Sequence, residues 1–279
     1  MTTKTQTTQT ADTNNSHDTM GLTKANTTAT ARQIAFFRTI PWCAALLSNP
    51  SLVIDQAVSR YLTHTPRDVL ISRTLNRADA IPAYITFYST GSATPTPSQS
   101  QPTATTTTPT TPTTPAPAHQ TDKDGLIKEI HALLALGPAL NGWEGLCHGG
   151  IVTTLLDEVM GQVFSVNRNE GRLPADGPPA LTGYLNTTFL KPVRTGTALQ
   201  GGLGEGTRGA EGIDVKGAGV GEENAGAAGE GNGPAVVLIT GRLLKREGRK
   251  YWLEAVLEKE GGVVLAKAEA MFVVLRERL

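Results

Sequence analysis

The most informative segment of the chain, residues 141–161, reads NGWEGLCHGGIVTTLLDEVMG. It opens as a glycine-rich loop and continues with pairs of large apolar residues every four positions, which is typical of one face of a buried helix. These pairs are Ile151/Val152, Leu155/Leu156, Val159/Met160 and Val163/Phe164. His148 lies in the loop just before the helix, and Asp157 lies within it, beside the apolar face. A carboxylate there costs free energy unless it is paired, hydrogen-bonded or functional, so Asp157 is the first candidate functional residue.

Length and composition narrow the classes of protein to consider. The 279 residues include 25 basic and 25 acidic side chains, so no net charge attracts nucleic acid or an anionic membrane. The only cysteines, Cys43 and Cys147, do not make a disulfide framework and fit a reducing compartment. No apolar run approaches a membrane span, and the first residues lack a secretory signal pattern. We therefore expect a cytoplasmic protein with no nucleic-acid partner and no membrane span.

Several segments contain too few apolar residues to form a core. Residues 1–30 are rich in Thr, Asn and Gln, and we expect a disordered tail; a mitochondrial targeting segment is the alternative. Residues 92–121, rich in Thr and Pro, and residues 201–234, rich in Gly, are expected to be disordered inserts. Residues 31–79 are expected to be a helical extension, split at Pro41. One folded domain, residues 80–279, remains once the inserts are set aside.

Strands are predicted on both sides of the central helix from β-branched and aromatic residues. One strand comes before the helix, at residues 83–88, and four come after it, at residues 181–190, 235–245, 250–259 and 263–275. Periodicity alone leaves residues 125–137 open as a helix or a strand.

The last strand indicates how helix and sheet fit together. Small side chains and one phenylalanine share one of its faces, which leaves room for a helix to lie against the sheet. They are Ala266, Ala268, Ala270 and Phe272. One long apolar helix wrapped by an antiparallel sheet of five or six strands is an α+β fold, and short exposed sheet edges favour pairing between subunits.

Three features together resemble the hotdog-fold thioesterases, in particular the phenylacetate-pathway type with its animal and fungal relatives. They are His148-Gly-Gly, Asp157 nine positions after His148, and the strand Thr182-Gly-Tyr-Leu-Asn-Thr-Thr-Phe-Leu-Lys-Pro192. The resemblance covers about residues 80–275 apart from the inserts, and it implies a hotdog fold with a long central helix. It also implies that residues 126–136 are a strand paired with residues 83–88. The insert between them then lengthens a hairpin turn, at a small cost in closure entropy.

The resemblance implies hydrolysis of a thioester, usually an acyl-CoA, without a cofactor. Gly149, with its N–H at the helix start, would bind the carbonyl oxygen as it becomes anionic, and His148 would fix the loop or donate a further hydrogen bond. Asp157 would act as general base or, as the second choice, as the attacking carboxylate. Thr182 would orient the water. The five histidines show no spacing of metal ligands, so we expect no metal.

Other residues near this motif are candidates for binding the substrate. We assign Asn141, Gly150 and Glu158 to this role; some relatives carry an Asn one residue closer to the motif, where it helps to hold the leaving group. Cys147 next to His148 suggests a thiol–imidazole pair, but adjacent side chains usually point apart, which favours a buried cysteine without a role. Basic residues at strand ends could hold CoA phosphates, although solvated strand ends explain them equally well. These residues are Lys191, Arg194, Arg249 and Lys250.

Spacing within the helix also bears on how the site is assembled. Nine helical positions from His148 to Asp157 correspond to a rise of about 13 Å and a rotation of about 900°, which leaves the two residues half a turn out of phase. One reaction centre therefore cannot touch both Gly149 and Asp157 of the same chain. Either the first residues are not yet helical, or Asp157 of one subunit meets His148 and Gly149 of its partner. We favour the shared site, which agrees with the homodimer known for the family, whereas a dimer of dimers (a homotetramer) is left open.

Two rival functions use the same fold. A hotdog dehydratase would need a catalytic histidine facing an acid on the helix, and the strand from Leu185 to Pro192 favours a thioesterase instead. A non-catalytic member would bind acyl-CoA in a regulatory role without hydrolysing it. The sequence does not define the acyl group.

Overall fold

The computed structural model describes residues 15–61, 67–90, 125–199 and 233–276. Its α-helices are α1 (Asn15–Arg38), α2 (Pro41–Leu46) and α3 (Gly149–Asn169). Short helical turns are η1 (Val58–Arg60), η2 (Leu70–Thr74) and η3 (Pro138–Leu140). The strands are β1 (Leu52–Gln56), β2 (Tyr84–Ser89), β3 (Glu129–Leu136), β4 (Asn141–Trp143), β5 (Leu146–Cys147), β6 (Ala180–Phe189), β7 (Ala235–Glu247), β8 (Lys250–Lys259) and β9 (Val263–Val274).

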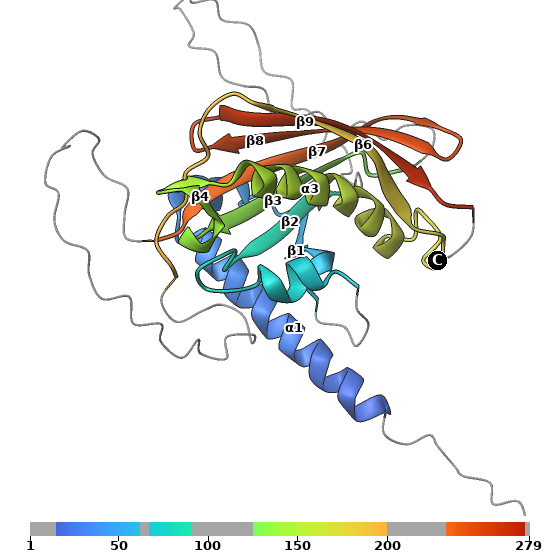
Figure 1. The fold of residues 1–279 in the computed structure, drawn as a ribbon. Coiled ribbons are helices and arrows are strands. Elements are labelled where there is room, and N and C mark those ends of the chain that lie inside the picture. The colour runs from blue at the N-terminus through green and yellow to red at the C-terminus, as the bar shows by residue number, and fades with distance from the viewer. Residues whose placement is uncertain (1–14, 62–66, 91–124, 200–232, 277–279) are drawn as a thin grey trace, which may run out of the picture.

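An antiparallel sheet of seven strands curves around α3, in the order β1-β2-β3-β7-β8-β9-β6 (Figure 1). A long helix enclosed by such a sheet is the hotdog arrangement, so the predicted α+β fold is confirmed. The sheet has seven strands where five or six were expected, and the strand that was not expected is Leu52–Gln56, which pairs with β2. The pairing of β2 with β3 confirms that residues 126–136 contain a strand, with Thr86 opposite Ala132.

The main core lies between α3 and the concave face of the sheet. Val152, Leu155 and Val159 of α3 are fully or almost fully buried, as the four-residue periodicity predicts. The small face of β9 is also buried, so the helix can approach the sheet closely. Gly241 of β7 lies directly under α3, where an added Cβ would come within 3.3 Å of Val159. The side chain of Asn167 fastens the far end of the helix, because its amide exchanges hydrogen bonds of 2.8 and 2.9 Å with the backbone of Ile127.

A second, smaller core lies on the opposite face of the sheet, under the N-terminal extension. Phe37 and Cys43 from α1 and α2 pack there against Ile85 and Leu133. The extension is split at Pro41 as expected, with Pro41 at the start of α2.

Two expectations for the N-terminal region differ from the structure. Residues 31–79 are not only helical, because they include β1. Helix α1 begins at Asn15, inside the segment for which we expected disorder, whereas residues 1–14 lie outside the described part. Low apolar content indicates that a segment cannot form a core, but it does not prevent a helix from extending outward from one that packs. Apart from Gly233 and Pro234, the two predicted inserts also lie outside the described residues.

Candidate active site

The loop before α3 is organised by His148, which caps the helix. Its Nδ1 accepts a hydrogen bond of 3.0 Å from the N–H of Gly150. This fixes the lone pair of the imidazole on Nδ1 and occupies the Gly150 N–H, which is therefore not available to a ligand. Gly149 is the first residue of the helix, so its N–H has no acceptor within the helix and is exposed at the positive end of the helix dipole.

The preceding hairpin of β4 and β5 holds His148 in place. The backbone N–H of His148 donates to the carbonyl of Leu140 at 2.8 Å, and that of Cys147 donates to Val193 at 2.8 Å. Gly142 lies so close to His148 that an added Cβ would be 2.8 Å from its Cα. The glycine-rich composition of the loop thus has a steric cause at this position.

Asp157 and Thr182 meet across the gap between α3 and β6. The Thr182 hydroxyl donates a hydrogen bond of 2.9 Å to Oδ1 of Asp157. Burial raises the pKa of Asp157 above its usual range, and the hydrogen bond from Thr182 acts in the opposite direction. The structure therefore brings together the two residues that the sequence suggested as base and water-orienting group, and it makes the carboxylate more basic than a solvated aspartate.

His148 and Asp157 remain separated within one chain. Helix α3 is regular from Gly149, so the alternative in which the first residues are not helical is wrong. Nine helical steps then place the two residues about 13 Å apart along the axis. The neighbours on β6 differ accordingly, since Gly149 faces the ring of Phe189 and Asp157 faces Thr182.

Glu158, the next residue on the helix, makes contacts with the N-terminal extension. Its carboxylate accepts a hydrogen bond of 2.6 Å from Gln162 and another from Ser59, and burial raises its pKa. Gln162 also donates to Ser59 at 3.1 Å and accepts from the N–H of Val58 at 3.1 Å. These contacts fasten η1 to α3 beside Asp157. Sequence reasoning missed Ser59 and Gln162, because more than 100 positions separate them.

Asn141 lies on the other side of the loop, on β4. Its side-chain oxygen accepts a hydrogen bond of 2.5 Å from the Thr195 hydroxyl, a partner that no sequence signal indicated. Cys147 is partly buried, and burial raises the pKa of its thiol to about 12. Its sulfur contacts the carbonyl oxygen of His148, not the imidazole, which agrees with a cysteine that has no catalytic part.

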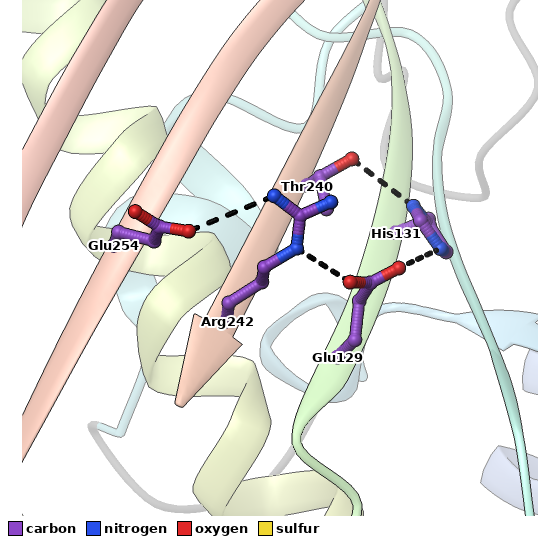
Figure 2. A network of polar contacts seen from close by, with 5 residues as sticks. All are labelled: Glu129, His131, Thr240, Arg242 and Glu254. Atoms are coloured by element: carbon purple, nitrogen blue, oxygen red, sulfur yellow. Dashed lines mark hydrogen bonds and ion pairs between the residues drawn. The ribbon is translucent and has the colours of Figure 1, made fainter. Parts of the chain in front are cut away.

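A second polar cluster lies on the other face of the sheet (Figure 2). Glu129 is 3.1 Å from Nε2 of His131, whose Nδ1 is 3.0 Å from the Thr240 hydroxyl, and Arg242 bridges Glu129 and Glu254. The order acid, imidazole, hydroxyl resembles a catalytic triad. However, Thr240 is only 6% exposed, so its hydroxyl is not accessible to a substrate. We interpret this cluster as structural. Within the described residues no group of three potential ligands could hold a metal ion, and no helix is long and apolar enough to cross a membrane.

Comparison with known proteins gives partial matches. No protein-family model matches the chain. Verlamelin biosynthesis protein B of Lecanicillium is 31% identical over 151 residues, 47% of this chain and 55% of that protein, so the chain spans about half the length of this curated relative. Among solved structures, the chain is similar to the BH2602 protein of Bacillus halodurans with CoA, at 26% identity and a TM-score of 0.34 over 57% of this chain and 74% of that chain. It is also similar to a hypothetical thioesterase of Streptococcus pneumoniae with coenzyme A, at 14% identity and a TM-score of 0.34 over 55% of this chain and 86% of that chain.

Proposed function

We propose that the protein is a thioesterase of the hotdog-fold superfamily that hydrolyses acyl-CoA to the free acid and CoA. The observation that carries the proposal is the partly buried Asp157, hydrogen-bonded by Thr182 and located on the helix whose exposed N-terminus follows His148. An acyl transfer to water needs a base and a group that stabilises the oxyanion, and these two features supply both. The sequence motif around them resembles that of the phenylacetate-pathway thioesterases.

In this mechanism the thioester carbonyl oxygen is bound at the start of α3. The N–H of Gly149 donates to it, and the helix dipole favours the negative charge that develops there. Gly150 contributes indirectly, because its N–H holds the His148 ring in place. Nε2 of His148 is then the remaining ring nitrogen that can face the substrate.

Asp157 acts on the water. Its carboxylate takes a proton as the water oxygen attacks the carbonyl carbon, and Thr182 holds the carboxylate in position. Collapse of the tetrahedral intermediate breaks the carbon–sulfur bond, and the CoA thiolate leaves and takes up the proton. Water and thioester are thereby converted to a carboxylic acid and a thiol. The atoms and charges of this reaction balance without a cofactor or metal.

We further propose that each site is shared between two copies of the chain. In the described residues β6 is a free edge of the sheet, and it carries large apolar side chains that are 44–53% exposed. These are Leu181, Tyr184 and Phe189, with Leu190 directly after the strand. An exposed apolar edge of this kind favours pairing with an identical strand in a two-fold dimer. Such a dimer offers a partner for the second half of each site, which the separation of about 13 Å within one chain demands.

The partly exposed side of α3 leaves room for an acyl group next to the base. Gly161 lies one turn after Asp157, and an added Cβ at this position would contact nothing within 4 Å. An apolar group bound beside Asp157 would reach this space. A panel of acyl-CoAs in a thiol-release assay measures which acyl groups this space accepts.

A thiol-release assay on a panel of acyl-CoAs tests the proposal. Asp157→Asn should lower kcat by roughly 10²–10⁴-fold, since removal of a general base has effects of this size. Asp79→Asn is the matched control, because the carboxylate of Asp79 is partly exposed and is paired with Arg77. Hydrolysis that is unaffected by Asp157→Asn contradicts the mechanism. Binding of acyl-CoA without turnover by the wild type supports the non-catalytic rival, and hydration of an enoyl-CoA without thiol release supports the dehydratase.

A further inference from the structure

A groove of about 1100 Å³ opens beside the hairpin that leads to His148. The N-terminal extension forms one wall through Ile40 and Trp42, and the chain after β6 forms another through Lys191, Pro192 and residues 194–198. Asn141 and Gly145 of the hairpin region line the end nearest the candidate site, and Lys259 and Glu260 contribute from the end of β8. The groove and the His148 loop therefore share one continuous surface.

The groove carries an excess of positive charge. Lys191, Arg194 and Lys259 line it, and all three are exposed. None of these cations forms an ion pair with another residue in the part of the chain that the structure describes. Glu260 is the acid among the lining residues, so the walls hold three cations against one anion. Unpaired lysine and arginine side chains in a concave surface are the groups that bind phosphates.

Trp42 adds a flat aromatic surface to the same groove. It follows Pro41 at the start of α2, and it packs partly against the small outer core while also lining the groove. An indole fixed in this way can stack on a nucleobase, a contact that is favourable for every base because each has a π face. Trp42 belongs to the N-terminal extension, which lies outside the motif that resembles the thioesterases.

We infer that this groove binds the phosphorylated adenosine end of CoA, with the cations on its phosphates and Trp42 stacked on the adenine. The inference rests on the proposed function and extends it by giving the N-terminal extension a part in substrate binding. The thioester end then lies at the start of α3, and the pantetheine arm runs past Asn141 into the groove.

The test uses the full chain and two independent readouts. Isothermal titration with adenosine 3′,5′-bisphosphate measures binding at the groove without any catalysis. Steady-state assays then compare an acyl-CoA with the matching acyl-pantetheine, which lacks the nucleotide. The variants are Lys191→Ala, Arg194→Ala and Trp42→Leu, and the control is Lys245→Ala, an exposed lysine that pairs with Glu247 at the opposite end of β7 from Ala235 and Val236 of the groove.

Removal of one charge-assisted phosphate contact should weaken binding of the bisphosphate and raise KM for acyl-CoA about tenfold. Loss of the stacking surface in Trp42→Leu should raise the Kd of the bisphosphate and the KM for acyl-CoA by about fivefold or more. The kinetic constants for acyl-pantetheine, and all constants of Lys245→Ala, should stay unchanged.

The outcomes separate the two proposals. Bisphosphate binding that depends on Lys191 and Arg194 supports the groove even if no thioester is hydrolysed, in which case only the catalytic proposal fails. A wild-type protein that does not bind the bisphosphate, or variants that bind it as tightly as the wild type, overturn the inference. If Trp42→Leu does not fold, the variants Lys191→Ala and Arg194→Ala still test the inference, because both side chains are exposed and their substitution does not disturb the core.

Discussion

Complementation between two inactive variants tests the shared site most directly. One chain carries Asp157→Asn, which removes the base. The other carries Gly149→Asp, which puts a negative charge where the oxyanion would develop. Both changes should leave the fold intact, since Asn nearly matches Asp in shape and an acidic side chain is favourable in the first turn of a helix. An added Cβ at Gly149 lies 3.5 Å from Phe189, an ordinary contact.

The expected recovery follows from the geometry. If each site combines the α3 start of one chain with Asp157 of the other, a mixed dimer has one intact site and one doubly altered site. Random exchange in an equal mixture makes about half of the dimers mixed, so about a quarter of wild-type activity should return. If each site were contained within one chain, every site in the mixture would be defective and recovery would be close to zero.

The assay is thiol release after partial unfolding and joint refolding of the two variants, with differently tagged chains to measure the fraction of mixed dimers. Each variant refolded alone serves as the control. Verified mixed dimers without any recovery of activity would falsify the shared site.

Three further predictions concern individual contacts. Thr182→Val removes the hydrogen bond that lowers the pKa of Asp157, so the acid limb of the kcat/KM–pH profile should move to higher pH; an unmoved limb contradicts the role of Asp157 as base. Gly142→Ala places a methyl group 2.8 Å from the Cα of His148, and we expect a loss of about 1–3 kcal/mol in urea unfolding together with reduced turnover; the substitution should be harmless if the loop can shift. The pKa of Glu129 is lowered to about 2, chiefly by the hydrogen bond from His131, so its contribution to stability is complete above about pH 4.5 and is lost as the pH falls toward 2. Glu129→Gln should therefore destabilise the protein by about 2 kcal/mol at pH 7, and the difference from wild type should shrink at pH 3, as denaturant curves at the two pH values would show.

The central helix and five of the strands could be predicted because their signals are local. The four-residue repeat from Ile151 to Phe164 and the two-residue alternation around Ala268 follow directly from which side chains the core buries. The family resemblance decides the open choice at residues 125–137, since β3 is buried on both faces over most of its length and its apolar residues do not alternate there.

Other features could not be predicted because they depend on contacts between distant parts of the chain. Strand β1 is short, and its pairing with β2 is what makes it a strand. Thr182 and Asp157, 25 positions apart, are assigned to one site only through the family resemblance, and the anchoring of Glu158 depends on Ser59 in the extension. The sequence indicated which residues are chemically unusual, whereas their partners emerge only from the fold.

The position of Asp157 links catalysis to assembly. In a single chain its carboxylate is only partly buried, and burial already raises its pKa. In the proposed dimer a second copy covers β6 and the open side of α3, which removes more water from Asp157 and raises the pKa further. A stronger base therefore forms at the same moment as the site is completed by the partner's Gly149, and a separate subunit has neither. Specific activity should accordingly fall when the protein is diluted below the dissociation constant of the dimer, and the apparent pKa of the remaining activity should still be that of the dimer.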